Sequence, residues 1–242
     1  MAKKEIVYNT HTVAISYEML NLSCEKTIVF LHGWGSNKEM MKQAFGNGFK
    51  GFKHLYIDLP GFGSSSIPAI FDTQAYANIT ALFLNALGIH PYAIFGHSFG
   101  GKVATLLSSQ RLVLLSSAGI VPPKPLQTRL KIALFKSTKH FLPKHFYRFF
   151  ASKDVEGMSQ QMYEILKKVV NEDFREIFLT CKAKSYIFWG KEDRATPLKS
   201  GEIIASLIPE NHFFPLEGDH FFFLKNAHRI EILLVESGFE NV

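Results

Sequence analysis

Short apolar runs recur along the chain, and each ends in a polar or glycine-containing turn. Apolar runs without alternation are typical of strands that are buried on both faces of a sheet. Segments with apolar residues at helical spacing lie between them, notably residues 73–87 and 100–108. This alternation of strands and helices predicts an α/β fold, with a mostly parallel central sheet and helices on both of its faces. The predicted strands cover residues 27–31, 53–58, 92–96, 111–116 and 185–189.

The start of the chain and one proline-rich stretch depart from this alternation. Residues 5–8 and 12–17 are separated by a short turn, which predicts a hairpin at the sheet edge. From residue 122 to 182, prolines interrupt amphipathic, helix-like pieces and no strand pattern is present. We interpret residues 122–182 as a helical cap inserted into one core domain, which is formed by residues 1–121 and 183–242. A final helix is predicted over residues 226–237.

The composition is that of a globular protein, because 47% of the 242 residues are hydrophobic and 20% are charged. No apolar run has the length of a signal peptide or of a membrane span, which needs ~20 residues. We therefore predict a cytoplasmic protein without stable membrane insertion. Cys24 and Cys181 are the only cysteines. A disulfide scaffold is excluded and two free thiols are expected, although counting alone leaves a single bridge open.

Positive charge is concentrated in one region of the sequence. The net charge is +6 and the isoelectric point is about 9.2. No acidic residue stands between Asp72 and Asp154. That stretch carries Lys102, Arg111, Lys124, Arg129, Lys131, Lys136, Lys139, Lys144, Arg148 and Lys153. We expect no nucleic-acid partner.

The segment Gly96-His97-Ser98-Phe99-Gly100 follows a predicted strand and opens a helix-like segment. A G-x-S-x-G nucleophile elbow requires this context. Glycines at both ends allow a tight strand-to-helix turn, so the serine hydroxyl lies exposed near a helix N-terminus that favours developing negative charge. The alternative is a glycine-rich turn that happens to contain a serine. We predict that Ser98 is a catalytic nucleophile.

A serine hydroxyl needs a base to take its proton, and the base needs an orienting partner. Asp193 stands in the loop after the last predicted strand, and His220 stands in the turn before the final helix. The neighbouring acids Glu192 and Asp219 are less well placed to reach the histidine ring. We predict His220 as the general base and Asp193 as its orienting acid, in the chain order Ser, Asp, His.

The oxyanion that forms when a serine attacks a carbonyl is usually held by two backbone N–H groups. The residue after the nucleophile, Phe99, supplies the first predicted donor. Trp34 supplies the second, because the glycines on either side of it let the loop after residue 31 turn its amides toward Ser98; an ordinary strand-to-helix turn is the alternative. Aromatic residues flank these motifs, so we expect an apolar pocket. The predicted pocket residues are His32, Gly33, Phe62, His97 and Phe221, of which His32 and His97 are also interpreted as structural hydrogen-bonding groups.

The loop and turn motifs together resemble the α/β-hydrolase family with a helical cap. They are His32-Gly-Trp-Gly35, Asp58-Leu-Pro-Gly-Phe-Gly-Ser64, Gly96-His-Ser-Phe-Gly-Gly101, Trp189-Gly-Lys-Glu-Asp193 and Gly218-Asp-His220. Residues 32–37 and 58–64 look most like those of carboxylesterases that demethylate pimeloyl-carrier-protein methyl ester. This resemblance implies hydrolysis of a carboxylic ester through an acyl-enzyme, without a metal or organic cofactor. It also implies an acidic acyl carrier protein that docks on the basic cap, for which a solvated basic face is the alternative.

Other members of the family offer alternative activities. The meta-cleavage-product hydrolases, which cleave carbon–carbon bonds in 2-hydroxy-6-oxo-dienoates, share the triad and the cap. They commonly have Asn before the serine and Trp after the histidine, where this chain has His97 and Phe221. Dehalogenases and epoxide hydrolases use an aspartate nucleophile, and Ser98 argues against both. A catalytically idle ligand-binding protein of the same fold is the remaining alternative.

Overall fold

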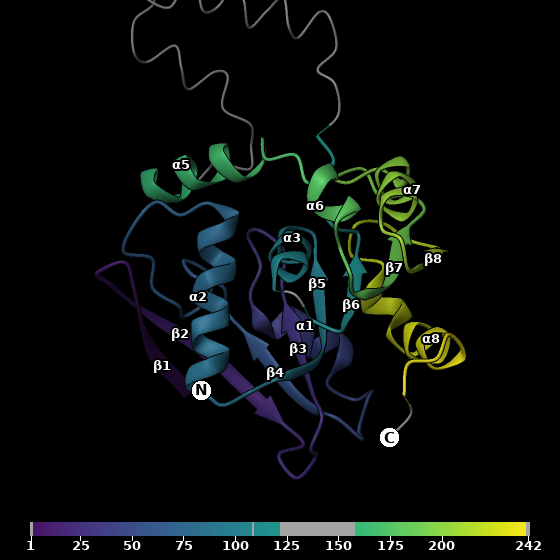
Figure 1. The fold of residues 1–242 in the computed structure, drawn as a ribbon, viewed down its shortest axis with the longest axis horizontal. Coiled ribbons are helices and arrows are strands. Elements are labelled where there is room, and N and C mark those ends of the chain that lie inside the picture. The colour runs from purple at the N-terminus through teal and green to yellow at the C-terminus, as the bar shows by residue number, and fades with distance from the viewer. Residues whose placement is uncertain (1, 108, 122–157, 241–242) are drawn as a thin grey trace, which may run out of the picture.

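The computed structural model describes residues 2–107, 109–121 and 158–240. Within them, eight strands form one sheet in the order β1-β2-β4-β3-β5-β6-β7-β8 (Figure 1). β1 and β2 form an antiparallel hairpin at one edge, β2 pairs antiparallel with β4, and the strands from β4 to β8 pair in parallel. The strands are Ala2–Tyr8 (β1), His11–Leu20 (β2), Thr27–Leu31 (β3), Lys53–Ile57 (β4), Pro91–His97 (β5), Arg111–Leu115 (β6), Lys184–Gly190 (β7) and Asn211–Leu216 (β8).

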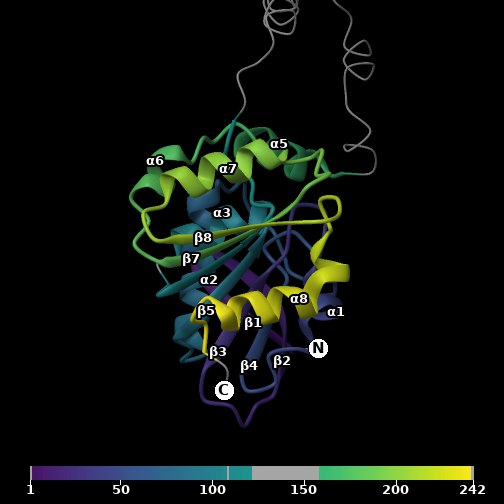
Figure 2. The ribbon, with the colours of Figure 1, turned by 90° about the vertical axis from the view of Figure 1, so that its right-hand side faces the viewer.

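Helices cover both faces of the sheet (Figure 2). One buried cluster joins the sheet to α2, α3, α5, α6 and α7, and a second joins the opposite face to α1 and α8. Both faces are thus closed to water, as a parallel sheet requires. The helices are Lys38–Phe45 (α1), Thr73–Ala86 (α2), Phe99–Leu106 (α3), Gln160–Val169 (α5), Arg175–Leu179 (α6), Leu198–Leu207 (α7) and Phe223–Glu236 (α8).

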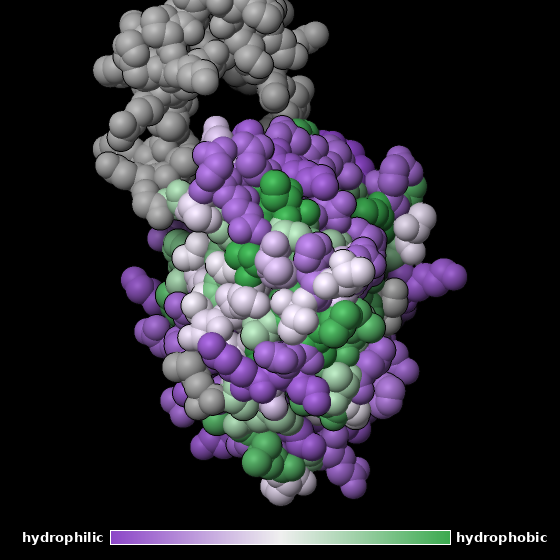
Figure 3. Space-filling view, turned by 90° about the vertical axis from the view of Figure 1, so that its left-hand side faces the viewer, coloured by the Kyte–Doolittle hydropathy of each residue, from purple (hydrophilic) through white to green (hydrophobic). Residues whose placement is uncertain are grey.

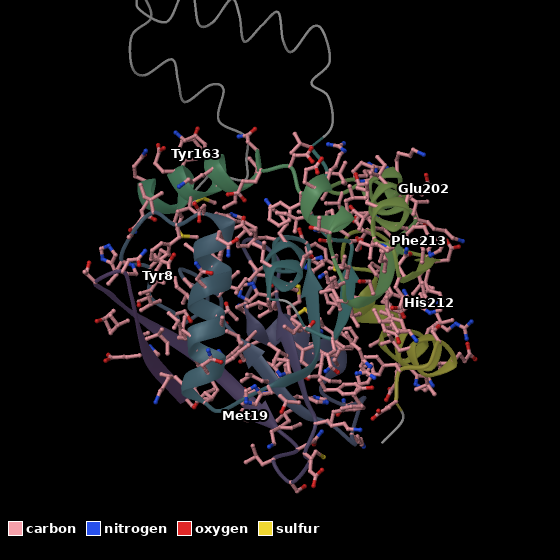
Figure 4. The ribbon with its side chains drawn as sticks, in the orientation of Figure 1. Tyr8, Met19, Tyr163, Glu202, His212 and Phe213 are labelled. Atoms are coloured by element: carbon pink, nitrogen blue, oxygen red, sulfur yellow. The ribbon has the colours of Figure 1, made fainter. Side chains whose placement is uncertain are left out.

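The α/β fold, the five predicted strands and the edge hairpin are confirmed. The sequence patterns do not predict β8, α1 or α7. β8 is an edge strand, and it lies at the opposite end of the sheet from β1, as the positions of Phe213 and Tyr8 show (Figure 4). Its side chains are only partly buried, and it contains Pro215. Edge strands tolerate proline because one side of the strand makes no ladder hydrogen bonds, but proline weakens the sequence pattern of a strand.

Aromatic side chains fill much of the face under α1 and α8. The ring of Phe30 on β3 lies 4.6 Å from that of Tyr56, 4.9 Å from that of Phe95 and 5.5 Å from that of Phe45. All of these rings are buried. Packed aromatic rings gain from both area burial and ring geometry. The chain has 23 phenylalanines among its 242 residues, and part of them therefore belongs to the core rather than to a binding site.

The predicted cap falls partly within the described residues, because 122–157 lie outside them. The remaining part is helical, with α5 and α6 lying above α2 and α3 in Figure 1. Backbone hydrogen bonds fasten it to the loop after β6, since the Phe174 N–H donates to the Gly119 carbonyl over 2.8 Å. Its boundaries as a separate domain remain a prediction.

The described surface mixes polar and apolar side chains. On the face shown in Figure 3, hydrophilic residues surround separate apolar patches. Large exposed apolar side chains include Val7 and Ile70. No helix in the described ranges combines the length and the apolar character that crossing a bilayer requires.

Candidate active site

Ser98 lies at the sharp junction between β5 and α3, with φ 50° and ψ −114°. A positive φ is costly for a residue with a side chain, and such strain gathers at functional sites. Hydrogen bonds hold the junction, since the Ser98 N–H donates to the Leu115 carbonyl (3.1 Å) and the Ser98 carbonyl accepts from the Ala118 N–H (3.0 Å). A Cβ atom on Gly100 would lie 2.5 Å from the His32 carbonyl oxygen, so only glycine fits there.

Asp193 and His220 meet beyond the carboxyl ends of β7 and β8. The Nδ1 atom of His220 lies 2.7 Å from Oδ2 of Asp193. The carboxylate side chain is fully buried, whereas 16% of the histidine side chain is exposed. The two residues are 27 positions apart in sequence. The structure therefore joins the predicted acid and the predicted base, and leaves the ring partly open to solvent.

Several donors surround the Asp193 carboxylate. Its Oδ1 atom accepts from the backbone N–H groups of Ala195 (2.8 Å) and Thr196 (2.9 Å). Burial by itself raises the pKa of Asp193, but the hydrogen bonds from His220 and Thr196 hold the pKa below its usual value. The carboxylate is therefore ionised at neutral pH, as an acid that orients a histidine must be.

Thr196 belongs to this cluster, although the sequence analysis did not name it. Its hydroxyl lies 2.8 Å from Oδ2 of Asp193 and 3.3 Å from Nδ1 of His220. The indole N–H of Trp189 donates to the Thr196 carbonyl over 2.7 Å and fixes the turn. The sequence carries a signal for this turn, because an Asp in a loop favours an Asx turn, in which its side chain accepts from backbone N–H groups two and three positions later.

The backbone of the loop after β3 runs beside the nucleophile. A Cβ atom on Gly33 would lie 3.1 Å from the Ser98 Cβ atom. The Trp34 ring packs edge-on against the Phe99 ring at 5.5 Å. Phe99 is the first residue of α3, where a helix offers its N–H no internal acceptor. Neither the Trp34 nor the Phe99 backbone N–H donates to another group of the described residues. Both predicted oxyanion donors are thus close to Ser98 in the fold and unengaged within this part of the chain.

His32 fastens this loop to the neighbouring one. Its buried ring bonds to the Gly33 carbonyl through Nδ1 (2.8 Å) and accepts the Leu59 N–H through Nε2 (3.0 Å). Burial lowers the pKa of His32 to about 4, so the ring is neutral. Phe62 packs edge-on against it at 5.4 Å. These contacts position the Trp34 backbone.

The Asp58-to-Ser64 motif is also built around a buried contact. The Lys38 ammonium lies 2.8 Å from Oδ2 of Asp58, and both side chains are almost fully buried. The Ser64 N–H donates to the same carboxylate oxygen over 3.0 Å. Burial raises the pKa of Asp58, yet the bonds from Lys38 and Ser64 bring the pKa below its usual value. Gly63 is required here because its Cβ would lie 2.3 Å from the carboxylate carbon.

Ser98 borders a cavity of about 490 Å³. The wall is formed by the loop after β6, the segment between α5 and α6, and the start of α7. The other lining residues are Lys102, Ser117, Ala118, Gly119, Ile120, Val121, Val169, Val170, Glu172, Arg175, Ala195, Thr196, Pro197, Lys199, Ser200 and Ile203. Most of the lining surface is apolar, so the cavity suits an apolar group next to the serine.

The predicted pocket residues lie elsewhere than in this wall. His32, Gly33, Phe62 and His97 are absent from the lining of the cavity. Phe221 and His220 border a separate hollow of about 400 Å³. The sequence motifs therefore give the loops that support Ser98, while the cavity wall comes from segments that carry no motif. Among the residues described, no group of three or more His, Cys, Asp or Glu side chains could hold a metal ion.

Comparisons with known proteins address the family of the chain and its fold. The sequence profile of the alpha/beta hydrolase family matches residues 28–231. A 2-succinyl-6-hydroxy-2,4-cyclohexadiene-1-carboxylate synthase from Klebsiella pneumoniae is 36% identical over 83 residues, which are 34% of this chain. The match spans about a third of that enzyme, 32% of its length.

Two solved structures share the fold over almost the whole chain. An esterase from Thermogutta terrifontis superposes with a TM-score of 0.71 at 17% identity and covers 98% of both chains. A meta-cleavage product hydrolase from Pseudomonas fluorescens IP01 superposes with a TM-score of 0.66 at 18% identity and covers 96% of both chains. The predicted α/β-hydrolase fold is confirmed. With the family profile matching most of its length, this chain belongs to the alpha/beta hydrolase family.

Proposed function

We propose that the protein is a carboxylesterase in which Ser98, His220 and Asp193 act as a catalytic triad. The observation that carries the proposal is the combination of a strained Ser98 beside a largely apolar cavity with a buried carboxylate 2.7 Å from the His220 ring. A serine nucleophile needs a base that is itself oriented by a third group, and in this proposal His220 and Asp193 fill these two roles. A serine activated in this way reacts through an acyl-enzyme.

The reaction proceeds in two steps of acyl transfer. Oγ of Ser98 attacks the ester carbonyl while Nε2 of His220 takes the hydroxyl proton. The Asp193 carboxylate accepts a hydrogen bond from the Nδ1–H group of His220 and stabilises the imidazolium that forms. The backbone N–H groups of Phe99 and Trp34 hold the oxyanion. His220 then gives its proton to the leaving alcohol, and a water molecule, activated in the same way, releases the carboxylic acid.

The cavity is assigned to the acyl group of the ester. Its apolar wall includes Ile120, Val121, Val169 and Ile203. Burying an aliphatic acyl chain against such a wall is favourable at roughly 25 cal/mol per Å². A small-molecule ester with an apolar acyl group is therefore the proposed substrate class.

An ester carried by an acidic acyl carrier protein is a narrower form of the same proposal. Its support is the acid-free sequence between Asp72 and Asp154. Two cations of that stretch are described, and both are engaged within the fold. Lys102 is buried against Glu172, and the Arg111 guanidinium lies 4.2 Å from the centre of the Tyr92 ring. The docking charges would have to come from Lys124 to Lys153, which lie outside the described residues.

Carbon–carbon hydrolysis of a dienoate is the second candidate. Arg175 and Lys199 border the cavity, and a dienoate would bring a carboxylate that such cations attract. Each already has an acidic neighbour, Asp173 for Arg175 and Glu202 for Lys199. Rates on a series of acyl esters and on a 2-hydroxy-6-oxo-dienoate separate the two candidates. Efficient turnover of the dienoate alone would overturn the ester proposal.

The replacement Ser98→Ala tests the nucleophile. We expect it to abolish hydrolysis of short p-nitrophenyl esters and labelling by a fluorophosphonate probe. Ser206→Ala is the matched control, because Ser206 is exposed and its hydroxyl donates to the Ile203 carbonyl within α7. Full activity in the Ser98→Ala protein would refute the assignment. A wild-type Ser98 that the probe does not label would instead indicate an idle, ligand-binding member of the family.

A further inference from the structure

His97 is the last residue of β5 and immediately precedes Ser98. Its side chain is 1% exposed. The ring lies between three loops: the elbow that it belongs to, the turn that carries His220, and the loop that carries Trp34. Figure 1 shows β5 in the middle of the sheet with α3 starting at its end.

One ring nitrogen of His97 contacts the turn that carries the proposed base. Nε2 lies 3.0 Å from the His220 carbonyl oxygen. A carbonyl oxygen can only accept, so Nε2 must carry the proton and donate it. The His97 and His220 rings are also 4.6 Å apart, and the ring of Phe223, the first residue of α8, lies 4.7 Å from that of His97. The backbone of His220 is thus tied to the residue next to the nucleophile.

The other ring nitrogen faces the loop of the proposed oxyanion donor. A Cβ atom on Gly33 would lie 2.8 Å from Nδ1 of His97. Nδ1 is buried and has no hydrogen-bond partner within the described residues. Burial lowers the pKa of His97 to about 3, so the ring stays neutral and keeps one donor and one bare acceptor. The ring therefore packs so closely against Gly33 that a side chain there would clash with it.

We propose that His97 is a positioning residue, which sets the His220 turn and the Gly33–Trp34 loop at fixed places relative to Ser98. It acts through the main chain of His220 and is separate from Asp193, which acts on the His220 ring. This inference rests on the proposed function, because it assigns His97 to the same reaction. Displacing a catalytic group by about 1 Å can cost about 100-fold in rate, so a single buried hydrogen bond at this point has a large effect.

Two substitutions at one position test the role. His97→Leu keeps an apolar side chain of moderate size and removes the donor. His97→Gln keeps a side-chain N–H group that can reach the His220 carbonyl. Each protein is first titrated to completion with a fluorophosphonate, so that turnover of p-nitrophenyl butyrate is expressed per reactive serine. We expect His97→Leu to lower kcat by about 10- to 100-fold with KM changed by less than about threefold, and His97→Gln to recover most of the loss.

His54 provides a matched control. It is fully buried, and its Nε2 atom contacts the Phe49 carbonyl over 3.0 Å, which is the same kind of contact as in His97. It lies near the amino end of β4, whereas Ser98 follows the carboxyl end of β5. His54→Leu should lower the melting temperature and leave kcat per reactive serine unchanged.

Two results would overturn the inference: a His97→Leu protein that turns over within about threefold of wild type per reactive serine, or a His97→Gln protein that is no faster than His97→Leu. If His97→Leu does not fold, His97→Asn replaces it, because its shorter side chain keeps the amide but falls short of the His220 carbonyl. Equal rates for the Asn and Gln variants would then contradict the role. Failure of the proposed function appears separately, as probe labelling that persists in Ser98→Ala.

Discussion

Two acid–base pairs lie close to the turn that carries Ser98, and they differ in how completely their hydrogen-bonding groups are used. In the Asp193–His220 pair, Nδ1 of the ring is engaged, while Nε2 has no partner within the described residues. In the Lys102–Glu172 pair, the ammonium donates to the Glu172 carboxylate (3.0 Å) and to the Val169 (2.7 Å) and Glu172 (3.3 Å) carbonyls.

The His220 ring therefore keeps a nitrogen that can exchange a proton, whereas the Lys102 ammonium stabilises the fold. All three donors of an ammonium are used at Lys102, which lies on α3 one helical turn after Ser98. Glu172 also accepts from the Thr73 backbone N–H at the start of α2 over 3.3 Å. The pair therefore joins α3, α2 and the segment between α5 and α6. Two pairs of oppositely charged groups near the same turn therefore have different roles.

The substitution Asp193→Asn should have the largest effect. The amide would present an N–H group to Nδ1 of His220 and hold the ring in the wrong tautomer. We expect kcat to fall by about 10⁴-fold, since a triad aspartate replaced in this way has an effect of that size. Rates of p-nitrophenyl ester hydrolysis measure the loss, and urea unfolding checks that stability changes little. A loss below about tenfold would place Asp193 outside the proposed triad.

Lys102→Met tests the other pair and should act mainly on stability. It leaves the partly exposed Glu172 carboxylate without its cation. Removing one partner of a buried pair costs about 3 kcal/mol, and the exposure of Glu172 places the expected loss at or below that value. Urea unfolding measures the change in the free energy of unfolding.

The exposed pair Lys199–Glu202 is the control for that measurement, because Lys199→Met should change stability by less than about 1 kcal/mol. Equal losses in the free energy of unfolding for Lys102→Met and Lys199→Met would show that burial does not make the Lys102–Glu172 pair more stabilising than an exposed pair. A Lys102→Met protein that keeps its stability and loses all activity would instead assign Lys102 to the reaction.

The smallest predicted effect concerns pH, and it compares the buried His32 and His97 with the exposed His228. Burial holds the pKa of His32 at about 4 and that of His97 at about 3. The unfolded chain takes up these protons below about pH 6.5, whereas the folded chain does not. The free energy of unfolding is therefore fully retained above pH 6.5 and falls as the pH drops from 6.5 toward 4.

Each such histidine contributes a slope of about 1.4 kcal/mol per pH unit in that window. Urea unfolding at a series of pH values measures the slope. His97→Gln should reduce it by about that amount, and the exposed His228→Gln should leave it unchanged. An unchanged slope in His97→Gln would mean that His97 is protonated in the folded protein.

The sequence predicted those parts of the molecule whose physics is local. The strands from β3 to β7 are short apolar runs. The turn around Ser98 needs Gly96 and Gly100 because a side chain at either position would clash with the backbone, and the motif itself shows this spacing of glycines. Asp193 and His220 could also be named, because each stands in a turn directly after a strand or before a helix. Their contact across 27 positions is a tertiary fact.

Lys102 and Glu172 could not be assigned from the sequence, because their roles depend on partners from distant segments. The Lys102 ammonium donates to carbonyl groups 67 and 70 positions away. The cavity wall is made of ordinary apolar and polar residues that form a surface only once β6, α5 and α7 are packed together.

The α/β architecture and the sharp turn at Ser98 follow from local sequence patterns, since apolar periodicity and glycine spacing act over a few residues. The tertiary structure sets the pairing of the Lys102 ammonium with its three acceptors, and it leaves Nε2 of His220 without a partner among the described residues. Burial and hydrogen-bond geometry set both, and they arise when residues far apart in the chain are brought within about 3 Å of one another.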